Sequence, residues 1–109
     1  MADSQSLLGA FEEVVLRATQ HLSVTGYGVT IHAAIEQALG RRVSFGAVYA
    51  TLDRLEVKGL VKSWLGEPTP QRGGKAKRYY RIMGAGVAAI ERAELVRARL
   101  TPGVVRAGT

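Results

Sequence analysis

The stretch GRRVSFGAVYATLDRLEVKGL, residues 40–60, contains the best-bounded helix of the chain. Ser44 is a good N-cap, and Gly59 supplies the C-terminal stop of a helix that runs between them. The spacing predicts that one face of this helix is buried, with Phe45, Val48, Leu52 and Leu55. A second face, also at helical spacing and expected to be exposed, carries Ala47, Thr51, Arg54 and Lys58.

A second helix is predicted just before this one. Its apolar residues fall on one face, at Ile31, Ala34, Ile35, Ala38 and Leu39. Gly40 stands where a helix commonly ends in the left-handed conformation. Because only residues 40–43 separate the two helices, they must turn sharply against each other, which is the geometry of a helix-turn-helix.

Another amphipathic helix is predicted upstream. Its apolar residues are Leu8, Phe11, Val15, Ala18 and Leu22, and candidate N-caps are Asp3, Ser4 and Ser6. Small residues and two glycines in residues 23–28 mark the turn that ends it.

After Gly59 the pattern changes to that of a hairpin. Residues 60–65 and 77–83 contain Val, Trp, Tyr and Ile, and residues 66–75 between them are rich in turn formers and basic. A last helix is predicted over residues 86–100. The fold class is therefore mainly α with a small β-hairpin: a winged helix-turn-helix (1–83), a C-terminal dimerisation helix (84–100) and a disordered tail (101–109).

Composition agrees with one small basic domain. The chain has 109 residues, 15 Lys and Arg against 9 Asp and Glu, a net charge of +6 and no cysteine. Up to Leu55 there are four bases and five acids, and from Glu56 onward eleven bases and four acids. The excess in the second half indicates an anionic partner, and we expect a cytoplasmic protein because neither a membrane span nor a signal peptide is evident.

The basic run in residues 72–81 is the strongest single feature. Its glycines allow close approach to a phosphate backbone, and its bases neutralise charge. Arg54, Lys58 and Thr51 could reach DNA from the third helix, while the short side chains of Ser44, Gly46 and Ala47 would allow close approach to the groove floor. The alternatives are a loop charged for solubility, an ordinary exposed face with Asp53 and Glu56 as charge partners, and Tyr49 as the edge of the core.

The sequence does not indicate an enzyme. His21 and His32 lack ligands at metal-binding spacing, and Gly73-Gly74-Lys75 lacks the rest of a phosphate-binding loop. The neighbouring Glu12 and Glu13 point in different directions on a helix. We therefore expect no catalytic residue, no metal and no cofactor.

The last helix indicates a homodimer. One stripe consists of Ala89, Ala93, Val96 and Leu100, and Val87, Ile90 and Leu95 lie off it. This is more apolar surface than one core face requires, although the helix could also pack entirely into its own domain. The candidate dimerisation residues are Phe11, Val15, Ala89, Ile90, Ala93, Val96 and Leu100. Two-fold symmetry would suit a palindromic site on double-stranded DNA.

Residues 27–28, 40–61 and 72–80 together resemble the PadR family of bacterial transcriptional regulators, over residues 8–100. The resemblance implies a dimeric winged-helix repressor, joined through its C-terminal and first helices and released from a palindromic operator by small molecules such as phenolic acids or drugs. It assigns DNA contact to Ser44, Gly46, Tyr49, Arg54, Arg72, Lys75, Lys77 and Arg78. Some short members stack ligands on a tryptophan of the last helix, whereas Trp64 here falls on the first hairpin strand. The competing hypothesis is a winged-helix module whose basic wing binds an acidic protein.

Overall fold

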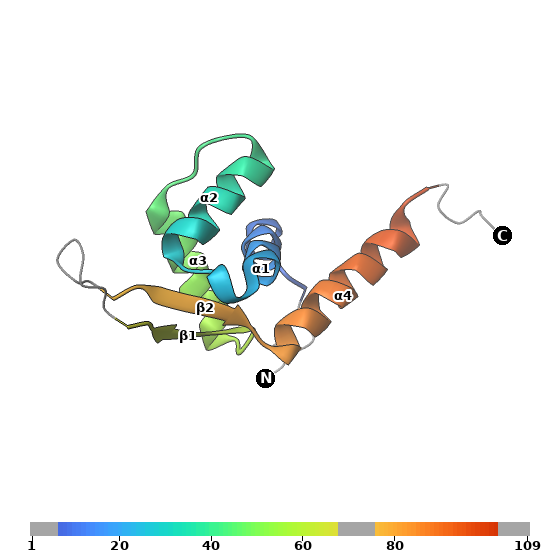
Figure 1. Cartoon of the computed structure of the whole chain (residues 1–109). Helices are drawn as coiled ribbons and strands as arrows, with labels where there is room; N and C mark the ends of the chain where they lie inside the picture. Colours follow the sequence, from blue (N-terminus) through green and yellow to red (C-terminus); the bar gives the residue numbers. More distant parts are fainter. Residues whose placement is uncertain (1–6, 68–75, 103–109) are drawn as a thin grey trace.

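The computed structural model describes residues 7–67 and 76–102. The helices and strands follow in the order α1 (Ala10–Leu22), a short 3-10 helix (Ser23–Thr25), α2 (Gly28–Leu39), α3 (Phe45–Val57), β1 (Val61–Leu65), β2 (Arg78–Ile82) and α4 (Gly84–Leu100). In Figure 1 the hairpin extends from one side of the three-helix body, and α4 projects from the other side. Each predicted element is present, in the order of a winged helix. None of the helices in the described ranges is long and apolar enough to cross a membrane.

The turn between α2 and α3 is held by backbone conformation and by two side chains. Gly40 ends α2 with a φ of 69°, in the left-handed region where glycine is favoured. The Val43 N–H donates to Glu36 Oε2 at 2.8 Å, and the Val43 carbonyl oxygen lies 2.7 Å from His32 Nε2. The Ser44 hydroxyl then accepts from the Ala47 N–H at 3.0 Å, which confirms the predicted N-cap of α3.

The two strands form an antiparallel hairpin whose inner face covers the helices. Val61 pairs with Ile82, and Ser63 pairs with Tyr80. Val61 and Tyr80 are buried among the side chains of α1, α2 and α3. The Tyr80 N–H also donates to the Gly26 carbonyl oxygen at 2.9 Å, which ties β2 to the segment before α2. The hairpin is therefore part of the core, and its outer face is left to solvent.

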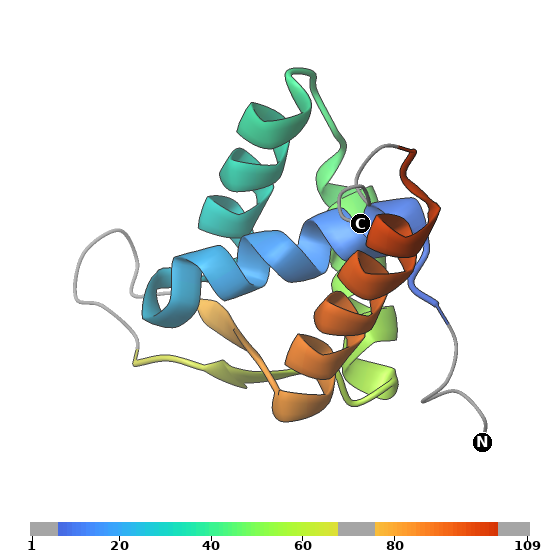
Figure 2. The ribbon, with the colours of Figure 1, turned by 90° about the vertical axis from the view of Figure 1, so that its right-hand side faces the viewer.

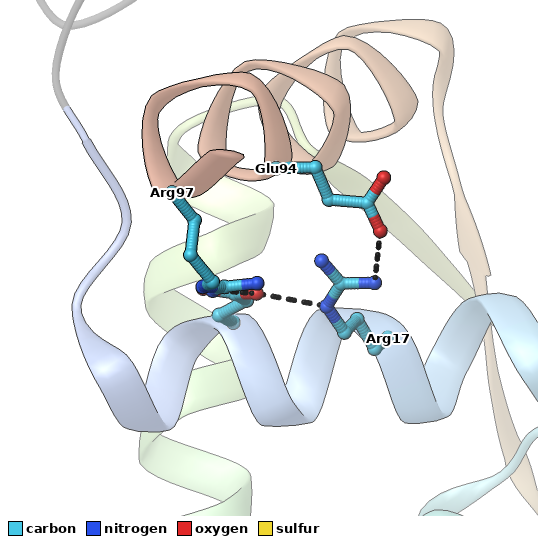
Figure 3. A network of polar contacts seen from close by, with 4 residues as sticks. Arg17, Glu94 and Arg97 are labelled. Atoms are coloured by element: carbon cyan, nitrogen blue, oxygen red, sulfur yellow. Dashed lines mark hydrogen bonds and ion pairs between the residues drawn. The ribbon is translucent and has the colours of Figure 1, made fainter. Parts of the chain in front are cut away.

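Helix α4 begins against the body and then crosses α1 (Figure 2). A Cβ atom at Gly86 would overlap the Leu60 carbonyl oxygen and the Ile82 side chain, so only glycine allows this close approach. Further along, Arg17 of α1 donates to Glu94 at 3.0 Å, and Arg97 pairs with Glu13 at 2.7 Å (Figure 3). Hydrogen bonding from Arg97 lowers the pKa of Glu13. Charge pairs as well as apolar contacts therefore join α1 to α4.

Several predicted placements are wrong. Thr51 was expected on the exposed face of α3 but is 2% exposed, while Phe45, expected in the core, is 47% exposed. Val15, Ala89 and Ile90 lie in the core of this chain, so they cannot form the surface of a dimer. The N-cap of α1 is Gly9, and the candidates Asp3, Ser4 and Ser6 lie outside the described residues.

Candidate nucleic-acid interface

The side of α3 that faces away from the core begins with two small residues. The helix packs inward through Val48, Thr51, Leu52 and Leu55. Gly46, Ala50, Asp53 and Val57 share the opposite side at helical spacing and are all exposed, Val57 by 88%. A helix that presents glycine and alanine in its first two turns can approach another surface closely. This face is turned relative to the predicted one, which carries Ala47, Thr51, Arg54 and Lys58.

A cleft lies beside α3, between the N-terminus of α2 and the start of β2. We call it the wing cleft; its volume is about 240 Å³, and it is lined by Tyr27, Gly28, Val29, Tyr49, Ala76, Lys77 and Arg78. The first N–H groups of a helix point outward without helical partners and carry partial positive charge. The cleft therefore combines a helix N-terminus, two cations and a tyrosine hydroxyl, a set that suits phosphate oxygens.

Tyr49 is positioned by the backbone of Gly28. A Cβ atom at Gly28 would overlap the Tyr49 ring, so the ring packs directly on the first residue of α2. On its other side Tyr49 stacks with Phe45, their ring centroids 6.1 Å apart, and Phe45 stacks on His32 at 3.9 Å. Tyr49 is 38% exposed, which is consistent with a ring at the edge of the core whose surface remains accessible.

The two described cations that line the wing cleft differ in their contacts. Lys77 Nζ lies 4.7 Å from the centre of the Tyr27 ring, a cation–π contact that holds it at the wing cleft. Arg78 donates to the Ser63 hydroxyl at 3.0 Å, and that hydroxyl bonds Glu56 of α3 at 2.9 Å. Both side chains are exposed, and Arg78 is tied into the hairpin.

Arg54 and Lys58 face α1 rather than the open side of α3. Lys58 Nζ lies 2.9 Å from Glu12 Oε2, and Arg54 Nε lies 3.6 Å from the same oxygen. Arg54 also donates to the Thr51 hydroxyl at 3.1 Å. The charge partner of Arg54 and Lys58 is therefore Glu12 and not the predicted Asp53 or Glu56.

Glu12 is nearly buried and is held by several donors. Burial alone would raise its pKa, but the Gly9 N–H and the charges of Lys58 and Arg54 outweigh this, so the pKa of Glu12 lies below its ordinary value. Its carboxylate joins the start of α1 to the end of α3. This contact holds the end of α3 against the start of α1. The spacing of residues in the sequence did not predict it.

The structure thus brings together only part of the predicted site. Tyr49, Lys77 and Arg78 meet at the wing cleft, with Ser44 and Gly46 exposed at the start of α3. Arg72 and Lys75 lie outside the described residues. The first residues of α2 were not among the predicted site residues, although the Tyr27-Gly28 pair before a helical pattern marks the start of this helix in the sequence.

Another cleft, of about 510 Å³, adjoins the turn between α2 and α3. It is lined by His32, Glu36, Arg42, Val43, Ser44 and Phe45. The polar groups of His32 and Glu36 are already used to hold Val43. In the described part of the chain there is no group of three residues that could hold a metal ion.

Comparison with known proteins agrees with this architecture. Residues 20–92, from the end of α1 into α4, match the profile of the transcriptional regulator PadR-like family. No curated protein gives a significant match.

Solved structures share the fold. A PadR family regulator from Clostridium difficile R20291 is 22% identical with a TM-score of 0.64, and the match covers 84% of this chain and 90% of that chain. The PadR-like regulator of Bacillus cereus is also 22% identical with a TM-score of 0.66, and 84% of each chain is covered. RosR of H. salinarum is 25% identical with a TM-score of 0.67, over 92% of this chain and 83% of that chain. This chain belongs to the PadR-like family of transcriptional regulators, which act by binding DNA.

Proposed function

We propose that the protein is a dimeric, sequence-specific repressor that binds a palindromic operator. The observation that carries this proposal is the exposed small-residue face of α3 beside the wing cleft. In the proposed complex the first turns of α3 enter the major groove, where Gly46 and Ala50 permit close approach.

Phosphate contacts are assigned to the wing cleft. The N–H groups at the start of α2, the Tyr49 hydroxyl and Lys77 would bind one strand of the duplex beside the groove. Arg78, Arg72 and Lys75 would extend this contact along the wing. We assign Arg54 and Lys58 first to holding α3 through Glu12, since a contact to DNA would compete with that ion pair.

The dimer is assigned to α4 and α1. Leu95 and Leu100 of α4 are 49% and 76% exposed, and α4 projects away from the body (Figure 1). An apolar cleft of about 260 Å³ lies between α1 and α2, lined by Val14, Arg17, Ala18, His21, Ala34 and Ala38. Phe11, Ala93 and Val96 are half-buried and could complete such an interface.

Leu95→Glu is expected to weaken the dimer at least about 100-fold, because a carboxylate would be buried at the interface without a partner. Sedimentation velocity across a concentration series measures this. The matched control is Val24→Glu, which also replaces an exposed apolar residue with glutamate but lies outside α1 and α4. Equal dimerisation of the two variants would remove Leu95 from the interface.

Release by a small aromatic or drug-like ligand is carried over from the family resemblance. Trp64 lies on β1, so a ligand pocket that stacks on a tryptophan of α4 is not available to this chain. Thermal-shift screening followed by DNA-release assays tests whether an inducer exists.

Selection of native genomic fragments by the purified protein tests the function. We expect enrichment of fragments that share one inverted repeat, including sequence upstream of its own gene. If no sequence is enriched and an acidic protein is instead captured through the wing, the chain is a protein-interaction module.

A further inference from the structure

The outer face of the hairpin carries a row of aromatic rings with a cation at each end. Cross-strand pairing places Trp64 beside Tyr79 and Lys62 beside Arg81 on this face, because directly opposed residues point to the same side. The neighbouring residues Val61 and Tyr80 point the other way, into the core. The row is therefore not required to cover the helices.

Each ring or cation contacts the next one along the row. Lys77 lies over Tyr27 at 4.7 Å, and Tyr27 meets Tyr79 with ring centroids 5.4 Å apart. Tyr79 stacks on Trp64 at 6.0 Å with an interplanar angle of 19°. The Arg81 guanidinium lies 5.7 Å from the centre of the Trp64 ring and ends the row.

A cleft opens at this second end. It has a volume of about 380 Å³, is lined by Lys62, Trp64 and Arg81, and is named here the outer cleft. Trp64 remains 38% exposed, and both cations are exposed. None of the described residues that line the cleft is acidic, so its charge is positive.

This combination matches one chemical class of ligand. A flat ring can stack on the indole of Trp64 or on the guanidinium plane of Arg81, and an attached anion can pair with Lys62 and Arg81. Aromatic platforms flanked by cations bind bases and phosphates in this way without requiring a particular sequence. We propose that the outer cleft binds a nucleotide unit, with the base stacked and the phosphate paired.

A nucleotide unit could come from a free nucleotide or from an unpaired strand, and the chemistry in the cleft is the same for both. The proposal does not depend on recognition of a duplex operator. It is tested without duplex DNA, so its failure and the failure of the proposed repressor function are distinguishable.

Trp64 is the only tryptophan in the sequence, so its fluorescence reports on the outer cleft alone. The full-length protein is titrated with 2′-deoxyadenosine 5′-monophosphate, and separately with deoxyadenosine and with deoxyribose 5-phosphate. We expect saturable quenching by the nucleotide, with an affinity about tenfold above that of either fragment. No saturable change, or equal affinity for one of the fragments, would overturn the proposal.

Two variants assign the binding to this cleft. Arg81→Gln and Lys62→Gln should each weaken nucleotide binding about tenfold, whereas the control Arg99→Gln on exposed α4 should leave it unchanged. Circular dichroism checks that each variant is folded, and having two variants keeps the test valid if one is not. An equal loss in Arg99→Gln would show general charge attraction and would refute the site.

Short oligo(dA) identifies the source of the nucleotide. Tighter binding per nucleotide by the oligomer than by the monophosphate, lost in Arg81→Gln, would assign the cleft to an unpaired strand. Equal binding per nucleotide would assign it to a free nucleotide.

Discussion

Ala50→Glu is expected to weaken binding to the operator duplex about 100-fold or more. Ala50 lies on the exposed side of α3, between Gly46 and Asp53 at helical spacing. In the proposed complex this side enters the major groove, so a new carboxylate would be desolvated next to the phosphates. Because the residue is exposed in the free protein, the fold should be preserved.

Fluorescence anisotropy with a selected operator duplex measures this effect. Ala85→Glu is the matched control, because Ala85 is also an exposed alanine within a helix but lies in the first turn of α4, on a different face from Leu95. The control should bind DNA nearly as well as the wild type. If Ala50→Glu binds as tightly as Ala85→Glu, the open side of α3 does not face DNA.

Glu12→Gln is expected to lower the free energy of unfolding by about 2 kcal/mol. The substitution removes the charge that pairs with Lys58 and Arg54, and it weakens the cap on the Gly9 N–H. Its nearly buried position explains why the effect exceeds that of an ordinary surface ion pair. Urea denaturation measures the change, and Glu91→Gln, at an exposed position on α4, is the control.

The same contact predicts a pH dependence. Since the pKa of Glu12 is lower in the folded protein than its ordinary value of 4.5, its contribution is complete above that value. The contribution is lost as the pH falls below 4.5 and through the lowered pKa of the folded state. The difference in stability between wild type and Glu12→Gln should therefore shrink in acid. A difference that is constant with pH would contradict the role of the charge.

Most of the fold could be predicted because local signals agree with the tertiary structure. Ser44 caps the start of α3 and Gly40 caps the end of α2, as predicted. Gly59, with a φ of 79°, follows the end of α3 as expected. The change of hydrophobic period after Gly59 located both strands of the hairpin to within about a residue or two.

The orientation of α3 could not be predicted from spacing. Thr51 lies three residues after Val48 and four before Leu55, so it fits the buried stripe as well as the polar one. Phe45 lies at the surface, 47% exposed, with its ring stacked on His32 of α2. The Glu12 contact joins residues 46 positions apart, which no local pattern reveals.

Spacing was also insufficient to predict which residues of α4 are available for dimerisation. The apolar stripe on α4 was recognised, but its first turns, with Ala89 and Ile90, close the core of this chain. Leu95 stays exposed although its neighbours Glu94 and Arg97 pair with α1, so it points away from α1, and Leu100 lies in the last turn of the helix. Periodicity gives the faces of a helix and does not show which apolar face packs into its own chain.

Sequence-specific recognition is tested by comparing the affinities of the protein for a selected operator duplex and for a shuffled duplex of the same composition. At physiological salt the operator should bind about 1,000-fold more tightly. With about eight phosphates neutralised, the logarithm of the affinity should also fall with the logarithm of salt concentration at a slope near −7. Equal affinity for both duplexes, or binding that does not respond to salt, would contradict sequence-specific recognition of DNA.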